Sequence, residues 1–222
     1  MSDIREAFLE SVPREHLPLA AQLGPFAILF AGGLWLLASW QKLPARLPIH
    51  WNWRGDPDSF VPRSPFGAAL PLLLGAVICG LMLVMQAGIR RGAPRSPMRA
   101  PVLKVVLAGE YLAALVSCGL LGASITAGRL LWPVLALAFA AILALLGYTG
   151  KIVRGLPRQP VRNPGAWRAG FIYVDRDDPA LFVPKRFGVG YTFNFGRPAA
   201  VALSFAFLVL PLIAVLVAIT AR

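Results

Sequence analysis

The stretch VLKVVLAGEYLAALVSCGLLGASITAGRLLWPVLALAFAAILALLGYTGK, residues 102–151, decides the fold of this chain. It holds two apolar runs, 102–127 and 131–151, with only Gly-Arg-Leu between them. A helix needs about 20 mostly apolar residues to cross the hydrocarbon core of a bilayer. Because the connection is so short, the two helices must lie side by side and run antiparallel. The stretch therefore predicts a tight hairpin of two membrane-spanning helices.

Three further apolar runs, at 18–40, 67–89 and 198–220, have a similar length and character. The chain of 222 residues is 57% hydrophobic and only 14% charged, which is too apolar for a soluble domain. The sequence predicts an all-α membrane protein with about five transmembrane helices, a proline-rich outer loop and a small β-hairpin element. The predicted parts are an N-terminal segment (1–17), a four-helix membrane domain (18–150) with its outer loop (41–66), an inner loop (151–197) and a fifth helix (198–222).

The positively charged residues lie between the apolar runs and are distributed unevenly. Sixteen of the 22 Lys and Arg fall on the side of the N-terminus, loop 89–104 and loop 151–197, and six fall on the other side. Because basic loops are retained in the cytoplasm, this bias places the N-terminus in the cytoplasm and the C-terminus on the outer side of the membrane. The net charge of +12 therefore reflects membrane insertion, and the expected partner is the lipid bilayer rather than a nucleic acid.

The start of the chain and the two cysteines carry little chemistry. The first sixteen residues hold four acids, unlike the basic start of a signal peptide, so we expect this segment to be retained. Its apolar residues follow helical spacing, which fits an amphipathic surface helix, although a flexible tail fits equally well. Cys79 and Cys118 lie inside apolar runs without CxxC spacing, which argues against a disulfide or a zinc site.

The outer segment LPARLPIHWNWRGDPDSFVPRSP, residues 43–65, is aromatic, polar and rich in turn residues. Its prolines prevent a continuous helix, and Gly55 next to Asp-Pro-Asp indicates a turn. We therefore expect an ordered lid with short turns at the outer surface of the bilayer.

Four polar residues of this lid are candidates for a ligand or metal site. His50, Asn52, Asp56 and Asp58 lie within nine residues and together supply imidazole, amide and carboxylate groups. They can bind a peptide or lipid head group, hold a divalent metal through His50, Asp56 and Asp58, or serve only as hydrogen-bonding and turn-capping groups. A zinc enzyme would need three protein ligands, and this spacing matches no established metal motif. We expect no other cofactor.

Glu110 is the acid that lies well inside an apolar run. An ionisable group at that depth is costly, so it indicates either a functional pathway or a hydrogen bond to a neighbouring helix or a loop arginine. At 1.5 Å rise per residue it lies on the order of 10 Å inside the inner surface, far from His50. A single active site that uses both residues is therefore not expected.

The inner segment WRAGFIYVDRDDPALFVPKRFGVGYTFNFG, residues 167–196, alternates aromatic runs with turn signals. It predicts a three-stranded element or a pair of hairpins, too small to bury a core alone, whose aromatic face packs on the helices, on lipid or on a partner. Its three aspartates indicate a capped turn rather than a calcium loop. Lys185 and Arg186 are expected to dock on anionic lipid or a cytoplasmic protein, and Asn194 is a further binding candidate.

The outer segment resembles the domain of unknown function of bacterial SdpI-type immunity proteins, with the pattern P-x-H-[FWY]-N-x-x-G-x-x-D. The inner segment is similar to a second small uncharacterised domain. The matching residues are Pro48, His50, Trp51, Asn52, Gly55 and Asp58 in the first, and Tyr173, Asp178, Pro179, Val183, Pro184, Lys185, Arg186, Gly188, Gly190, Thr192 and Asn194 in the second. The resemblance implies a five-span membrane protein whose two motif segments carry its function, and the SdpI-type branch adds resistance to a toxic peptide.

The sequence favours a binding, sensing, regulatory or resistance protein over an enzyme, because no P-loop, GxSxG or HExxH motif is present. Two alternatives stay open. One is a metal-dependent enzyme that acts on a lipid or peptide at the outer face, and the other is a small transporter component that uses Glu110.

Overall fold

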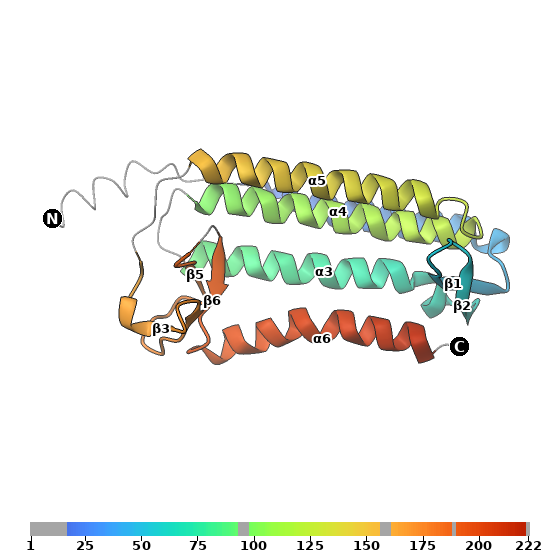
Figure 1. The fold of residues 1–222 in the computed structure, drawn as a ribbon. Helices are drawn as coiled ribbons and strands as arrows, with labels where there is room; N and C mark the ends of the chain where they lie inside the picture. Colours follow the sequence, from blue (N-terminus) through green and yellow to red (C-terminus); the bar gives the residue numbers. More distant parts are fainter. Residues whose placement is uncertain (1–16, 93–97, 156–160, 188–189, 221–222) are drawn as a thin grey trace.

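Long apolar helices form most of the molecule, which is represented by a computed structural model that describes residues 17–92, 98–155, 161–187 and 190–220. The helices run side by side along one axis (Figure 1). They are α2 (Leu19–Ala38), α3 (Pro65–Gly92), α4 (Arg99–Ile125), α5 (Leu131–Gly155) and α6 (Pro198–Thr220). By length and composition α2 to α5 can each cross a membrane, and α6 contains a shorter apolar stretch, Pro198–Leu210. The predicted all-α membrane fold is confirmed. The predicted N-terminal amphipathic helix lies outside the described residues.

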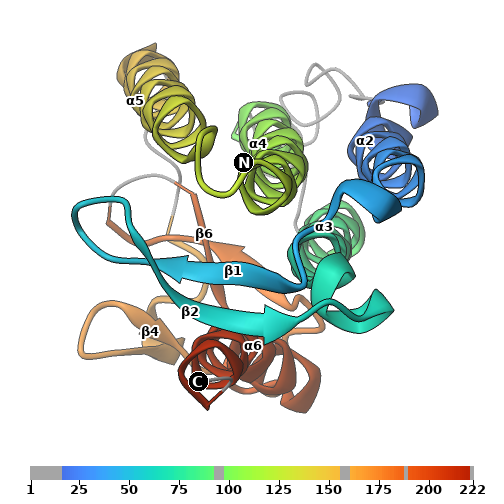
Figure 2. The ribbon, with the colours of Figure 1, turned by 90° about the vertical axis from the view of Figure 1, so that its right-hand side faces the viewer.

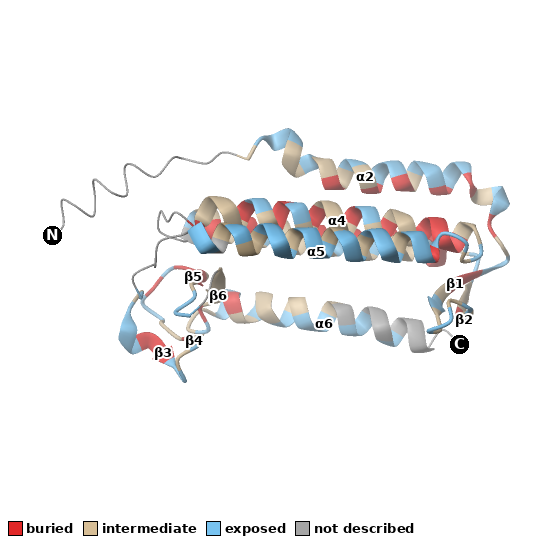
Figure 3. Cartoon of the chain, turned by 45° about the horizontal axis from the view of Figure 1, so that its top comes forward, coloured by how far each residue is buried: buried red, intermediate tan, exposed pale blue. Residues whose placement is uncertain are grey.

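The outer faces of the helices are apolar, as lipid contact requires. Leu37 on α2 and Leu137 on α5 are each 71% exposed. Figure 3 shows exposed positions along nearly the whole length of α5. Exposed leucines at this density would be unfavourable in water, whereas lipid tails solvate them without cost.

The helix bundle has its core where α2, α3 and α4 meet. Leu29, Leu72, Ala114 and Leu121 are buried there together. Small residues allow close approach: a Cβ added at Gly75 of α3 would stand 2.3 Å from the Ser117 hydroxyl oxygen of α4. Close packing of this kind drives helix association in membranes, where burial of apolar surface gives no advantage over lipid. The three helices therefore form the rigid part of the fold.

A small β element lies at each end of the bundle (Figures 1 and 2). At one end β1 (Arg46–Trp51) and β2 (Pro57–Pro62) form an antiparallel hairpin. At the other end β3 (Trp167–Arg168) pairs with β4 (Ile172–Tyr173), and β5 (Phe182–Pro184) pairs with β6 (Tyr191–Phe193). The outer segment is thus a β-hairpin, where the sequence predicted only a turn-rich lid. The inner segment is the predicted pair of hairpins, which includes a strand at β3 that was not expected.

The inner hairpins dock onto the helix bundle. Phe182 of β5 packs with Ile89 of α3 and Leu103 of α4. A Cβ on Gly88 would stand 2.7 Å from the Phe182 ring, so the ring lies directly on the backbone of α3. Phe182 thus packs on the helix bundle, one of the three surfaces proposed for the aromatic face, whereas Phe171 and Phe187 are exposed.

Candidate functional site

The turn of the outer hairpin is built by Asn52. Its Oδ1 accepts hydrogen bonds from the backbone N–H groups of Arg54 at 2.9 Å and Asp56 at 3.0 Å. Gly55 has φ of +87°, a left-handed conformation that glycine adopts without strain. Among the described residues, the Asp56 carboxylate accepts a hydrogen bond from the Asn52 amide alone, at 3.4 Å. Asn52, Gly55 and Asp56 therefore shape the turn.

The hairpin is held on the connection between α4 and α5. The Ser124 hydroxyl donates to the Pro48 carbonyl at 3.0 Å. Trp132 of α5 lies on Gly55, since a Cβ there would be 2.5 Å from its indole nitrogen. Trp51 lies against Gly128 in the same way, at 3.1 Å. These contacts fix the hairpin as a lid over the end of the bundle.

His50 and Asp58 face each other across the two strands. His50 Nδ1 lies 2.5 Å from Asp58 Oδ1, and the two side chains are 58% and 42% exposed. A carboxylate at Nδ1 holds the proton on that nitrogen and leaves Nε2 as the acceptor. Nε2 has no hydrogen-bond partner within the described part of the chain. The imidazole is therefore oriented and available to a ligand.

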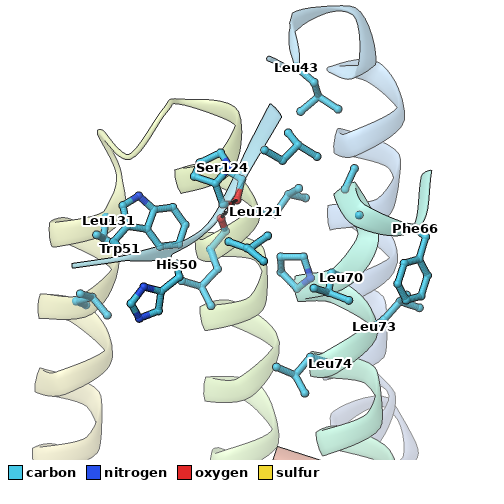
Figure 4. A pocket seen from close by; sticks show the side chains of 18 of the residues that line it. Leu43, His50, Trp51, Phe66, Leu70, Leu73, Leu74, Leu121, Ser124 and Leu131 are labelled. Atoms are coloured by element: carbon cyan, nitrogen blue, oxygen red, sulfur yellow. Dashed lines mark hydrogen bonds between the residues drawn. The ribbon is translucent and has the colours of Figure 1, made fainter. Parts of the chain in front are cut away.

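An apolar cavity of about 550 Å³ lies beneath the hairpin. Figure 4 shows the His50 ring below β1, in the space between α5 and α4, with Leu70 and Leu74 of α3 on the opposite side. The walls of the cavity come from β1, α3, α4, α5 and α6. The apolar residues that line it include Leu43, Leu47, Phe66, Leu70, Leu74, Val77, Leu120, Leu121, Leu131, Leu135, Leu210 and Ile213. Polar side chains reach it only near the hairpin, from His50, Asn52, Ser124 and the two tryptophans. The cavity suits an apolar chain whose polar end lies beside His50.

The three candidate metal ligands of the hairpin, His50, Asp56 and Asp58, do not meet at one point. Among the residues that the structure describes, no three His, Cys, Asp or Glu side chains come together around one point. His50 and Asp58 are paired, whereas the Asp56 carboxylate faces Asn52. Two ligands are fewer than a catalytic zinc site takes from protein.

Glu110 belongs to a separate, buried polar chain. Its Oε1 accepts a hydrogen bond from the Gln86 amide at 2.5 Å, and Arg90 donates to the Gln86 carbonyl at 3.0 Å. Arg90 also donates to Gln22 at 2.9 Å, which ties α2 into the chain. Glu110 is fully buried, and its Oε2 has no partner among the described residues. The Gln86 amide thus stands between the Arg90 guanidinium and the Glu110 carboxyl group.

The polar chain and the cavity occupy different halves of the bundle. Glu110 precedes Ser124, which contacts the hairpin, by fourteen residues on α4. That spacing is about 21 Å along the helix axis. The expectation that Glu110 and His50 do not share one site agrees with this separation.

Asn194 is buried at the centre of the inner hairpins. Its amide nitrogen approaches the carbonyls of Asp175, Asp178 and Ala180 at 2.8 to 3.1 Å. Its oxygen accepts from the backbone N–H groups of Asp175 and Gly196, each at 3.0 Å. Both ends of the amide are therefore occupied by backbone, and none of its polar atoms faces solvent.

The aspartates of the inner segment also serve the fold. Asp178 binds Arg162 through two hydrogen bonds of 2.6 and 2.8 Å and accepts from the Tyr173 hydroxyl at 2.9 Å. Burial, together with these carboxylate contacts, raises the pKa of Tyr173 well above its ordinary value. The hydrogen bond from the Asn163 amide lowers the pKa of Asp175. Lys185 and Arg186, in contrast, are exposed.

The structure thus separates the candidate residues into three places. His50, Asn52, Gly55, Asp56 and Asp58 are together at the hairpin, Glu110 is inside the bundle, and Lys185, Arg186 and Asn194 are at the other end. Sequence reasoning missed Gln86, the direct partner of Glu110, and Leu210 and Ile213, which bring α6 into the cavity wall. A glutamine inside an apolar run was the available signal for the first. No sequence signal marks the other two.

Comparison with known families gives two matches. Residues 27–75 match a domain of unknown function (DUF1648), and residues 176–201 match a family of unknown function (DUF5808). Neither the curated proteins nor the solved structures gave a match. The first match covers the second half of α2, the outer hairpin and the start of α3, and the second covers β5, β6 and the start of α6. The chain is a multi-pass membrane protein of uncharacterised type, and these matches do not confirm the narrower resemblance to SdpI-type immunity proteins.

Proposed function

We propose that this protein binds a lipid-like amphiphile of the membrane in the cavity beneath the outer hairpin, as the binding step of a sensing, regulatory or resistance function. The observation that carries the proposal is the apolar cavity of about 550 Å³ with His50 at its polar end. Cavities of roughly 300–1,000 Å³ with apolar walls and a few placed polar groups are typical of small-molecule sites.

The shape of the cavity favours a ligand with one long apolar part. Leu74 and Val77 lie along α3 below the hairpin, and Leu210 and Ile213 close the side formed by α6. When the apolar part of a ligand enters among these residues, it exchanges contacts with lipid for similar contacts with protein. The polar end of the ligand therefore decides its affinity and specificity. The free nitrogen of His50 and the carboxylate of Asp58 give that end both an acceptor and a charge.

The distribution of charge supports placing this site in the outer half of the membrane. The hairpin and the inner β element lie at opposite ends of the bundle (Figure 1). Sixteen of the 22 Lys and Arg belong to segments on the side of the inner element. With that side in the cytoplasm, the ligand comes from the outer leaflet or from outside the cell.

The alternatives fit the described residues less well. A metal-dependent enzyme would need ligands beyond His50 and Asp58. Elemental analysis of purified wild type and His50→Ala should therefore find no stoichiometric transition metal in either, and one metal per chain that the variant loses would restore the enzyme hypothesis. A transporter that uses Glu110 would need a polar path from Glu110 to the cavity, but packed apolar side chains of α2, α3 and α4 lie between them.

The proposal is tested by photo-crosslinking in the membrane. The probe is a phospholipid with a diazirine in its acyl chain, incorporated into nanodiscs with the full chain. Wild type should crosslink at the cavity walls of α3 and α5. Leu74→Trp fills the cavity and should reduce that crosslink several-fold. Leu137→Trp makes the same change on the lipid-facing side of α5 and should leave it unchanged.

A different crosslinking pattern would contradict the proposal. Crosslinks spread evenly over the exposed helix faces, and indifferent to Leu74→Trp, would show that the cavity holds no lipid. The physiological role has its own assay, since cells that express the protein should survive a membrane-active peptide that kills cells without it. Loss of survival in Leu74→Trp but not in Leu137→Trp would connect resistance with the cavity.

A further inference from the structure

We infer that the tips of the two inner hairpins form a single surface that binds the anionic lipid head groups of the membrane that the helices cross. This two-tip surface consists of Arg168 at the end of β3, Phe171 in the β3–β4 connection, and Lys185, Arg186 and Phe187, which follow β5. It lies at the opposite end of the molecule from the cavity, so it does not depend on the proposed ligand.

The β3–β4 connection is a tight turn that presents an aromatic ring. Ala169 and Gly170 have φ of 48° and 81°, and the Phe171 N–H donates to the Arg168 carbonyl at 3.2 Å. The Phe171 side chain is 66% exposed, although the residues before and after this turn are partly buried. The turn therefore places a large apolar group at its outermost point.

The second tip pairs an exposed ring with a guanidinium group. Arg186 lies over the ring of Phe187 at 5.4 Å, and Phe187 is 68% exposed. A Cβ added at Gly170 would meet the Phe187 ring at 3.4 Å, which is van der Waals contact. The two tips, with thirteen residues between them in sequence, are thus neighbours in space.

The charge of this surface is positive because two of the three nearby aspartates are held by hydrogen bonds within the inner segment. Asp178 is paired with Arg162 and Tyr173, and Asp175 accepts from the Asn163 amide and from its own turn. Asp177 is left as the exposed carboxylate of the segment. Within the described residues, no carboxylate pairs with Arg168, Lys185 or Arg186. Three cations beside two exposed rings complement an anionic surface with an apolar interior.

The position of the inner hairpins keeps these tips near the bilayer. Phe193 of β6 packs against Phe207 of α6 at 6.3 Å, and Phe182 lies on α3. The hairpins are thus fixed at the helix ends, and Figure 2 shows the β4 hairpin extending sideways beyond α6. Lateral extension from the bundle brings the tips over lipid rather than over the other helices. The head groups of the same membrane are therefore the partner that this surface meets first.

The experiment uses the full chain in nanodiscs of phosphatidylcholine, with or without phosphatidylglycerol. An environment-sensitive fluorophore is attached at Phe171→Cys, and unsubstituted protein treated in the same way corrects for labelling of Cys79 and Cys118. We expect a blue shift when the anionic lipid is added and its reversal at high salt. Lys185→Gln with Arg186→Gln should raise the amount of anionic lipid needed about tenfold or more, from roughly 1 kcal/mol per charge.

The control removes the same charge from the other end of the molecule. Arg46→Gln with Arg54→Gln should leave the lipid dependence unchanged. No response to phosphatidylglycerol, or an equal effect of both double variants, would overturn the inference. A blue shift that needs an acidic protein and ignores lipid would assign the surface to a protein partner instead.

Discussion

Replacement of Asn194 tests whether the inner segment carries a binding residue or a structural one. The amide makes five short contacts with buried backbone groups. An NH₂ group has only two hydrogens, so the three contacts at nitrogen amount to two full hydrogen bonds, and the oxygen adds two more. At about 1 kcal/mol each, Asn194→Ala should destabilise the inner hairpins by about 4 kcal/mol.

The assay is hydrogen exchange of residues 161–197 in detergent or nanodiscs, followed by mass spectrometry. Protection should collapse in this segment while α2, α3 and α4 keep theirs, because their core is separate. Asn163→Gly is the matched control, since Asn163 is exposed, has a left-handed φ of 33° that glycine also adopts, and makes one hydrogen bond to a side chain, at 2.7 Å. A loss below about 0.5 kcal/mol in Asn194→Ala would refute the structural assignment and return Asn194 to the ligand candidates.

Three further predictions concern the hairpin, the bundle and pH. Gly55→Ala should loosen the outer hairpin by more than about 1 kcal/mol, because it combines a left-handed φ with a clash against Trp132, and hydrogen exchange of residues 46–62 would reveal it. Glu110→Leu should lower the thermal stability in detergent, since Gln86 loses its acceptor at a cost of about 1–3 kcal/mol, and unchanged stability would contradict the buried chain. The raised pKa of Tyr173 means that the inner hairpins are stabilised below its ordinary pKa, near 10, and lose that stability as the pH rises above it. Tyr173→Phe should remove this alkaline sensitivity in a pH series of hydrogen exchange.

The helices were predictable because a membrane-spanning helix requires a run of about 20 mostly apolar residues, which can be seen directly in the sequence. Each apolar run became a helix, and the three residues Gly-Arg-Leu indeed stand at the turn between α4 and α5. Boundaries moved by a few residues, since α3 already begins at Pro65, and a proline suits the first turn of a helix.

The strands of the outer hairpin were missed because of their prolines. Pro48, Pro57 and Pro62 argued against a continuous helix and gave no sign of strands, yet a two-stranded hairpin has only edge strands, and proline is tolerated at edges. The turn residues were read correctly, since Gly55 has the left-handed φ that a turn requires. The residue types that make the turn can thus be recognised in the sequence, whereas strand pairing depends on contacts between residues on opposite sides of the turn.

The cavity could not be predicted from sequence. Its walls combine β1 with Leu210 and Ile213, more than 150 residues later in the chain. Such a space depends on how α6 is placed against the other helices, which no local pattern records. For Glu110 the sequence could predict only the kind of partner, such as a group on a neighbouring helix. Which residue fills that role depends on the relative rotation of α3 and α4, and in the structure it is Gln86.

The most direct test of ligand binding is an experimental density map of the full chain in lipid nanodiscs. We expect elongated density between Leu74 of α3 and Leu135 of α5, ending within hydrogen-bonding distance of His50 Nε2. A cavity that is closed by α6 packed against α3 and α5, with no such density, would contradict it.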